Sequence, residues 1–192
     1  AAKDNHIVVV SIFVNPAQFG PKEDLKKYPR PFKNDLELCR KAGVDFVFLP
    51  DNKSMYPPGF STFISVEGLS NVLCGALRPG HFRGVATVVT KLLNIIRPDV
   101  LYLGQKDAQQ AIIIARMIKD LNFPVKVKIM PIVRENDGLA LSSRNIYLNK
   151  EERSDAVVLS KALRLAESLV NNGQRNGPVI LNRMKQLIAK KK

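Results

Sequence analysis

Short apolar, β-branched runs alternate with helix-length amphipathic segments along much of this chain. The strand candidates are Ile7–Val14, Asp45–Leu49, Val100–Leu103 and Val125–Val133. The first three are almost continuously hydrophobic, as is typical of parallel strands that are covered on both faces. Strands that alternate with helices favour a parallel sheet with right-handed crossovers. The sequence therefore predicts an α/β fold.

Helical patterns fill the intervals between these strands. Phe32–Gly43 places Leu36, Cys39 and Arg40 at helical spacing and ends in a glycine suited to the position after a helix. Asp107–Asn122 begins with Asp107 as a candidate N-cap. The helix predicted for Gly84–Pro98 ends at its proline. Its apolar stripe consists of Val85, Val88, Val89, Leu92, Leu93 and Ile96.

The pattern changes from about Gly138 onward. Two long helical stretches, Lys150–Asn171 and Pro178–Lys190, are separated by the breaker sequence "NNGQRNGP". We therefore predict an α/β domain over residues 1–132 and a partial, mostly helical C-terminal domain over residues 133–192, which we expect to be incomplete.

Composition limits the functional classes. Thirty Lys and Arg against 17 Asp and Glu give a net charge of +13, which favours anionic ligands such as nucleotides or carboxylates. The charges are spread along helices, and aromatic residues make up only 7% without Trp, which counts against a single-stranded nucleic-acid platform. No window has the apolar length of a membrane helix, and the N-terminus does not read as a signal peptide. Cys39 and Cys74 are expected to be reduced, buried thiols in a cytoplasmic protein.

Polar residues gather directly after the predicted strands. Asn15 and Gln18 follow the first strand, "GQKDAQQ" (Gly104–Gln110) follows the third, and "RENDGLALSSRN" (Arg134–Asn145) follows the fourth. The second strand is followed by Asp51 and Tyr56 and is poorer in amides. Because ligands of parallel α/β sheets bind outside the carboxyl ends of the strands, these groups are expected to meet at one crevice.

The third strand end carries groups suited to a phosphate. Gly104 allows close approach to the backbone, and Lys106 supplies a mobile positive charge. Asp107 would cap the helix start, where free amide groups attract anions. Gln110 lies four residues after Lys106 and so can share its face. An ordinary capped helix with a surface lysine is the alternative interpretation.

Two further segments carry cations or hydroxyls. In "LSSRN", Ser142, Ser143 and Arg144 could grip phosphate oxygens, or the segment could simply cap a helix. In "RPGHFRG", Arg78 and His81 lie just before a helix, where they could contact a carboxylate or phosphate, or the histidine could be structural. Zinc-ligand spacing, a Ser–His–Asp set, a P-loop and a G-x-G-x-x-G fingerprint are all absent from the sequence.

Taken in order, the motifs resemble those of the pantothenate synthetase family. They are "FVNPAQFG", "YPR", "MYPPGFST", "RPGHFRGVATVVTKL", "GQKDAQQ" and "IVRENDGLALSSRN", and they cover about Ile7 to Arg153. The resemblance implies a cytoplasmic, usually homodimeric pantoate–β-alanine ligase that uses ATP and Mg²⁺. It also implies a Rossmann-like parallel sheet of the nucleotidyltransferase class, with pantoate, β-alanine and ATP as small-molecule partners and neither nucleic acid nor membrane.

The same resemblance implies a role for each motif residue. The catalytic residues would be Lys106, Ser142, Ser143 and Arg144. The ATP-binding residues would be Gly104, Gln105, Lys106, Asp107, Val133, Leu141, Ser142, Ser143 and Arg144, and the substrate-binding residues Gln18, Gln110, Asn15, His81 and Arg78. The segment Leu141–Arg144 would stand where related adenylating enzymes carry their phosphate-closing loop.

Several family features are absent from the sequence. The family's H-x-G-H motif would precede "VVVSIFVNP", and we expect this chain to begin just past it and to lack the last C-terminal strands. Asn34 stands where the family often has an acid before Asp35, which leaves the Mg²⁺ ligands unassigned. Two other hypotheses are a basic nucleic-acid-binding module and an adenylyltransferase with a different acceptor, which fits Gln18 and Gln110 less well.

Overall fold

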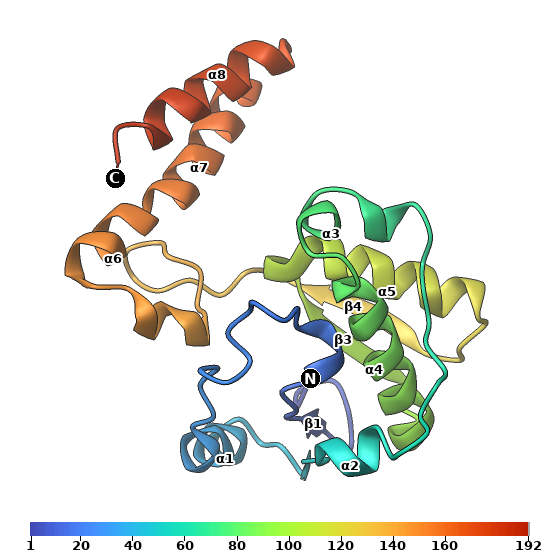
Figure 1. Ribbon diagram of the computed structural model, residues 1–192. Helices are drawn as coiled ribbons and strands as arrows, with labels where there is room; N and C mark the ends of the chain where they lie inside the picture. Colours follow the sequence, from blue (N-terminus) through green and yellow to red (C-terminus); the bar gives the residue numbers. More distant parts are fainter. Residues whose placement is uncertain (192) are drawn as a thin grey trace. The chain divides into compact units, whose positions relative to one another are not determined.

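The chain divides into two compact units in a computed structural model that describes residues 1–191. The first unit, Ala1–Pro131, contains the strands, and the second, Ile132–Lys192, is mainly helical. Figure 1 shows the first unit in blue to yellow and the helices of the second in orange to red. Each unit has its own set of internal contacts.

In the first unit, strands and helices alternate as the sequence predicts. The elements are β1 (Val9–Ser11), α1 (Phe32–Lys41), β2 (Phe46–Phe48), α2 (Asn52–Met55), α3 (Cys74–Leu77), α4 (His81–Ile96), β3 (Val100–Gly104), α5 (Ala108–Asp120) and β4 (Lys126–Met130). Three short 3₁₀ turns join them, namely η1 (Pro16–Gln18), η2 (Leu69–Asn71) and η3 (Gln105–Asp107). The sequence pattern did not predict α2 and α3, because a single turn carries no usable periodicity.

The strands pair in parallel, as predicted, but they form two separate two-stranded sheets in the described part of the chain. In the first sheet, β1 lies beside β2 with Val9 opposite Phe46. In the second, β3 lies beside β4 with Val100 opposite Lys126 and Gly104 opposite Met130. The α/β class with parallel strands is therefore confirmed, and within residues 1–191 β1 and β3 do not pair with each other.

The core of the first unit lies between α4 and α5 and the second sheet (Figure 1). Its buried members are Phe82, Val85, Ala86, Leu93, Ile113, Ile114, Met117 and Ile118, and Leu101, Leu103 and Val127 of the strands pack against them. Each fully buried large apolar side chain contributes roughly 1.5–3 kcal/mol relative to its exposed state. The predicted stripe of α4 is thus confirmed at Val85, Val88 and Leu93, which are buried.

The first sheet is covered much less than its hydrophobicity predicted. Val9 is 37% exposed and Phe46 is 62% exposed, so burial on both faces is wrong for β1 and β2. Helix α1, which connects these strands, buries none of its residues, and Leu38 is 56% exposed. The difference arises because the two helices that carry the core, α4 and α5, pack around β3 and β4.

Helix boundaries follow local chemistry. Gly43 adopts φ = 71° just after α1, which is the left-handed conformation expected of a glycine at that position. Helix α4 starts at His81, three residues before the predicted start, and Arg97 ends it with φ = 51°. The two cysteines are free thiols as predicted, but both are only partly buried.

The second unit consists of a turn followed by helices. The elements are η4 (Ser143–Tyr147), α6 (Lys150–Ala156), α7 (Val158–Asn171) and α8 (Gly177–Ile188). The predicted helix Lys150–Asn171 is split at Val157, whose N–H turns toward the carbonyl of Asp155. Helices α7 and α8 lie before and after the predicted break and pack against each other (Figure 1). A membrane-spanning helix is absent from the described residues.

Candidate active site

Asn15 forms the centre of a buried polar cluster just after β1, where only 2% of its surface is exposed. Its Nδ2 donates to Gln18 Oε1 and to the Gly84 carbonyl, each at 3.1 Å. Its Oδ1 accepts from the Ala17 N–H at 3.3 Å and from the Tyr56 hydroxyl at 2.7 Å. Both donor hydrogens and both acceptor positions of this amide are therefore satisfied by protein groups, which fixes its orientation.

Tyr56 reaches Asn15 from the segment after β2, which the sequence had placed at a strand end without assigning a role. Burial raises the pKa of Tyr56 to about 12, although its hydrogen bond to Asn15 acts in the opposite direction. The hydroxyl therefore stays protonated and donates at any pH near neutral. The first two strand ends thus meet at Asn15.

Gly84 in α4 lets the helix contact the η1 turn directly. A Cβ at this position would lie 2.2 Å from the Ala17 carbonyl oxygen and 2.6 Å from the Gln18 nitrogen. No side chain fits in that space, because real Cβ contacts stay above about 3.0 Å. The glycine therefore positions Gln18 against the first turn of α4, a role that was not predicted from the sequence.

The Gln18 backbone is held from the other side by His81 and Arg78. His81 Nδ1 lies 2.8 Å from the Gln18 carbonyl oxygen, and His81 Nε2 lies 3.1 Å from Arg78 Nη1. An arginine N–H can only donate, so Nε2 must accept and Nδ1 must carry the proton that goes to Gln18. The two contacts therefore favour the Nδ1–H tautomer of this buried ring.

Glu23 holds Arg78 in turn, and this residue was not predicted from the sequence. Arg78 donates through Nε to Glu23 Oε1 at 2.8 Å and through Nη2 to Glu23 Oε2. The hydrogen bond from Arg78 holds the pKa of the Glu23 carboxyl below its usual range, and Glu23 raises the pKa of Arg78. One signal was present in the sequence: Glu23 is an acid five residues after Gln18, just beyond the first strand-end motif.

A small cavity of about 120 Å³ opens beside this cluster. It is lined by Ala17, Gln18, Phe19, Phe63, Pro79, Gly80, His81, Arg83 and Gly84. The Arg83 guanidinium stacks over the Phe63 ring at 3.8 Å. This cation–π contact was not expected, because the two residues are distant in sequence.

The residues at the end of β3 are exposed, unlike the buried cluster around Asn15. The side chains of Lys106 and Asp107 are 39% and 58% exposed, and Lys106 Nζ contacts Asp107 Oδ1 at 3.2 Å. Asp107 holds the N-cap position of α5, but its side chain makes no capping hydrogen bond, so the predicted cap is wrong in that respect. The carboxylate faces Lys106 because the 3₁₀ turn Gln105–Asp107 precedes the helix.

Two glutamines follow this tip. Gln110, a predicted substrate-binding residue, is partly buried, and Gly104 and Gln105 are exposed. Gln109, which had no role assigned from the sequence, ties α5 to the segment before α3. It accepts from the Cys74 N–H at 3.1 Å and donates to the carbonyls of Leu69 and Val72 at 3.0 and 2.8 Å.

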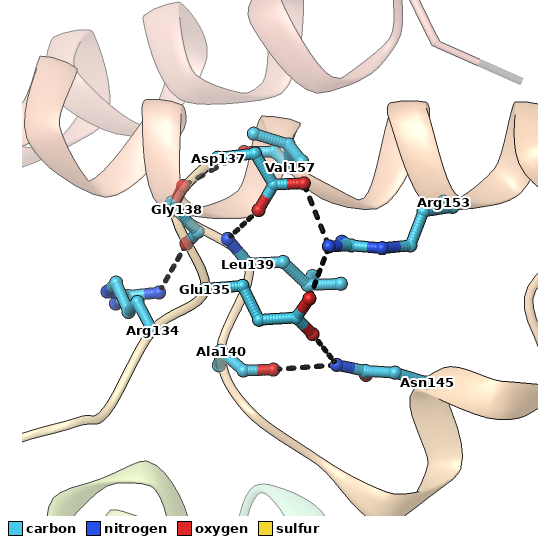
Figure 2. Close-up of polar contacts among 10 residues, drawn as sticks. Arg134, Glu135, Asp137, Gly138, Leu139, Ala140, Asn145, Arg153 and Val157 are labelled. Carbon is cyan, nitrogen blue, oxygen red and sulfur yellow. Dashed lines mark hydrogen bonds and ion pairs between the residues drawn. The ribbon is translucent and has the colours of Figure 1, made fainter.

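In the second unit, a turn from residue 133 to residue 141 is clamped by ion pairs (Figure 2). Arg153 Nη2 contacts Glu135 Oε2 at 2.6 Å and Asp137 Oδ2 at 2.9 Å. Asn145 Nδ2 donates to Glu135 Oε1 at 2.9 Å and to the Ala140 carbonyl at 3.1 Å. A hydrogen bond from the Leu139 N–H holds the pKa of Asp137 below its usual range.

This turn presents the residues of the second unit that were predicted to bind ATP. Val133 is 67% exposed and Leu141 is 57% exposed, and the Leu141 N–H donates to the Val133 carbonyl at 3.0 Å. Ser142 caps η4, because its Oγ accepts from the Arg144 N–H at 3.3 Å. The capping interpretation of this segment is therefore correct as a description of Ser142, while the roles of Ser143 and Arg144 toward phosphate stay predictions.

The structure thus joins one group of predicted residues by direct contacts, namely Asn15, Gln18, Arg78 and His81. The residues Gly104, Gln105, Lys106, Asp107 and Gln110 form a second group around the start of α5, and the residues Val133 and Leu141–Arg144 belong to the second unit. Within residues 1–191, His, Cys, Asp and Glu side chains form no cluster of three that could hold a metal ion. The part of the chain described here therefore offers no protein cage for Mg²⁺.

Polar groups that follow parallel strands, beside helix starts, are typical of an α/β protein that binds its ligands at the carboxyl ends of the strands, and the pantothenate synthetase structures that this chain resembles place it in the nucleotidyltransferase class. Solved structures agree: a pantothenate synthetase from Thermus thermophilus superposes with a TM-score of 0.95 at 46% identity, over 98% of this chain and 68% of that one. The model of the family described as pantoate-beta-alanine ligase matches residues 1–192, and the chain belongs to this family.

Curated relatives give the same result. The pantothenate synthetase of Moorella thermoacetica is 55% identical over 188 residues, which is 98% of this chain and 66% of the relative. A ligase from Francisella tularensis, solved complexed with beta-gamma ATP and beta-alanine, superposes with a TM-score of 0.81 at 36% identity, over 96% of this chain and 69% of that one. The chain spans about two thirds of the length of the curated relatives it matches.

Proposed function

We propose that the protein carrying this chain is an ATP-dependent ligase that joins pantoate to β-alanine through a pantoyl-adenylate intermediate. The observation that carries this proposal is the match of the pantoate-beta-alanine ligase family over all 192 residues. The Asn15–Gln18 cluster supports it, since Asn15 holds the neutral Gln18 amide in a position to bind a small hydroxy acid. We also propose that the protein works in the cytoplasm as a homodimer.

In the first step, a pantoate carboxylate oxygen attacks the α-phosphorus of ATP. The bond between that phosphorus and the bridging oxygen breaks, and pyrophosphate leaves. Such transfers need alignment and charge stabilisation more than covalent chemistry by the protein. Lys106 is suited to offset the charge that builds on phosphate oxygens, because its ammonium is partly exposed and pairs with a single neighbouring carboxylate.

The second unit supplies the remaining catalytic candidates. We assign phosphate contacts to Ser142, Ser143 and Arg144, with Leu141 and Val133 beside the nucleotide. The clamp of Arg153 on Glu135 and Asp137 supports this assignment, since it rigidifies the turn that presents these residues (Figure 2). We also assign Gly104, Gln105 and Asp107 of the first unit to contacts with ATP.

In the second step, the β-alanine amine attacks the carbonyl carbon of the adenylate, and AMP leaves with the bridging oxygen. Gln18 and Gln110 are assigned to pantoate, because amides bind hydroxyl and carboxylate groups without attacking a mixed anhydride. Asn15 orients Gln18 by direct contact, and His81 and Arg78 lie on the same side. Mg²⁺ is proposed as a companion of ATP, and since the described residues hold no carboxylate cage, no step is assigned to it.

The test is pyrophosphate release by the intact protein, with ATP and Mg²⁺ supplied. We expect release that requires pantoate, and AMP release that requires both pantoate and β-alanine. Equal AMP release without pantoate would contradict the proposal. Replacing pantoate by a carboxylate that lacks its hydroxyl groups separates this ligase from an adenylyltransferase with a different acceptor, because the pantoate-specific enzyme loses activity with the analogue.

A further inference from the structure

Glu23, which starts a relay by contacting Arg78 and through it His81 and the Gln18 backbone, has no assigned role in the proposed reaction. All three side chains are substantially withdrawn from solvent: those of Arg78 and Glu23 are 26% and 25% exposed, and His81 is 9% exposed. Arg78 uses Nε and Nη2 on Glu23 and Nη1 on His81. These donors are therefore committed within the protein.

His81 transmits this constraint to Gln18. Its Nδ1–H donates to the Gln18 carbonyl at 2.8 Å, and Arg78 Nη2 approaches the same oxygen at 3.5 Å. The Gln18 side chain is held separately, because its Oε1 accepts from Asn15 Nδ2 at 3.1 Å. Gln18 is thus fixed by its backbone and by one amide atom, and its amide Nε2 has no protein partner in the described part of the chain.

We propose that Glu23 is a positioning residue for this site: its carboxylate holds Arg78, Arg78 holds His81 in the Nδ1–H tautomer, and His81 fixes Gln18 for pantoate. The inference rests on the proposed function and changes one part of it. Arg78 and His81 then act through Gln18 and not by direct contact with substrate.

The geometry predicts what a neutral isostere does. In Glu23→Gln, one carboxylate oxygen becomes an NH₂ group that faces an Arg78 N–H, so two donors oppose each other. The Arg78 guanidinium must then turn, and its Nη1 loses its alignment with His81 Nε2. The ring can then exchange tautomers, and the hydrogen bond to the Gln18 carbonyl weakens. Arg78→Lys disrupts the same contacts differently, because a lysine ammonium cannot bond Glu23 and His81 in one plane as the guanidinium does.

Steady-state kinetics on the intact protein test the consequence for the site. For Glu23→Gln and Arg78→Lys we expect kcat/KM for pantoate to fall about tenfold while KM for ATP changes less than about twofold, since a displaced positioning group mainly affects its own substrate. The double variant should be no worse than either single variant. The matched control is Glu37→Gln, which removes two exposed ion pairs on α1, with Arg40 and Lys41, and should leave both constants unchanged.

Nitrogen-15 NMR of the imidazole tests the relay without using activity. The chain contains two histidines, so His6→Gln assigns the His81 signals. We expect one Nδ1–H tautomer in the unsubstituted protein and a mixture in Glu23→Gln. An unchanged tautomer together with unchanged kcat/KM for pantoate would overturn the role of Glu23. If the unsubstituted protein instead releases no pyrophosphate with pantoate, the proposed function fails, and the NMR result still decides whether the relay exists.

Discussion

The cluster around Asn15 and the tip of β3 are both strand ends, yet they are built in opposite ways. Asn15 is 2% exposed and its amide is held by four protein contacts. Lys106 has a side chain that is 39% exposed, and its ammonium pairs with the adjacent Asp107. The first region is organised before any ligand arrives, whereas the second keeps its charge accessible to one. Substitutions in the first should therefore affect stability and binding together, and substitutions in the second should affect activity alone.

The largest effect is expected from Gly84→Ala. The added Cβ would overlap the Ala17 carbonyl at 2.2 Å, so the η1 turn and Gln18 must move. Overpacking of this kind costs about 1–3 kcal/mol of unfolding free energy, and a misplaced Gln18 should lower kcat/KM for pantoate about 100-fold. Denaturant unfolding and steady-state kinetics measure the two effects. Gly177→Ala is the control, because a Cβ there meets no atom within 4 Å and should not destabilise the protein.

Lys106→Ala should come next, with a loss of activity and no loss of stability. Removing one positioned donor to the phosphates should slow adenylate formation by more than about tenfold. The melting temperature should stay unchanged, because the Lys106–Asp107 ion pair is exposed and contributes little. Lys119→Ala, near the other end of α5, is the matched control. An unchanged rate in Lys106→Ala would remove this residue from the mechanism.

Tyr56→Phe should have a smaller effect that again combines stability with binding. The variant loses the 2.7 Å hydrogen bond to Asn15 Oδ1, which should cost about 1 kcal/mol of unfolding free energy. Because the pKa of Tyr56 is raised from 10.0 to about 12, the contribution of the tyrosine is fully present below the lower value and is lost as the pH rises through the higher one. Unfolding measured near neutral pH and again near the raised pKa should therefore show the difference between the two proteins shrinking.

The smallest effect should be an acid dependence that originates at Glu23. Its folded pKa lies below 4.5, chiefly because Arg78 donates hydrogen bonds to it. Its stabilising contribution is present above pH 4.5 and is lost as the pH falls through the folded pKa. The unfolding free energy of Glu23→Gln should therefore vary less with pH on the acid side. Parallel curves for the two proteins would contradict this ion-pair contribution.

The sequence predicted the parts of the fold that depend on local patterns. The apolar runs located the four strands of residues 1–191, and the α4 stripe identified Val85, Val88 and Leu93 as core residues. It predicted burial of β1 and β2 wrongly, because hydrophobicity alone does not show which strands the helices cover. Phe46, for example, is 62% exposed in spite of its apolar neighbours.

The candidate site was predictable only in part. Asn15, Gln18 and His81 stood in recognisable strand-end and helix-start motifs, and the structure joins them. Glu23 and Gln109 were missed, because their roles depend on partners 55 and 35 residues away along the chain. The capping interaction assigned to Asp107 failed because its carboxylate faces the preceding lysine, a competition that spacing does not reveal.

The most direct measurement of the central claim uses pantoate labelled with oxygen-18 in its carboxylate. If the carboxylate attacks the α-phosphorus and the amine then displaces AMP, one labelled oxygen must pass to AMP and the other must remain in the amide product. We expect one oxygen-18 in each AMP, detected by mass spectrometry after turnover by the intact protein with ATP and β-alanine. Unlabelled AMP, or label in inorganic phosphate released alongside ADP, would contradict the adenylate route.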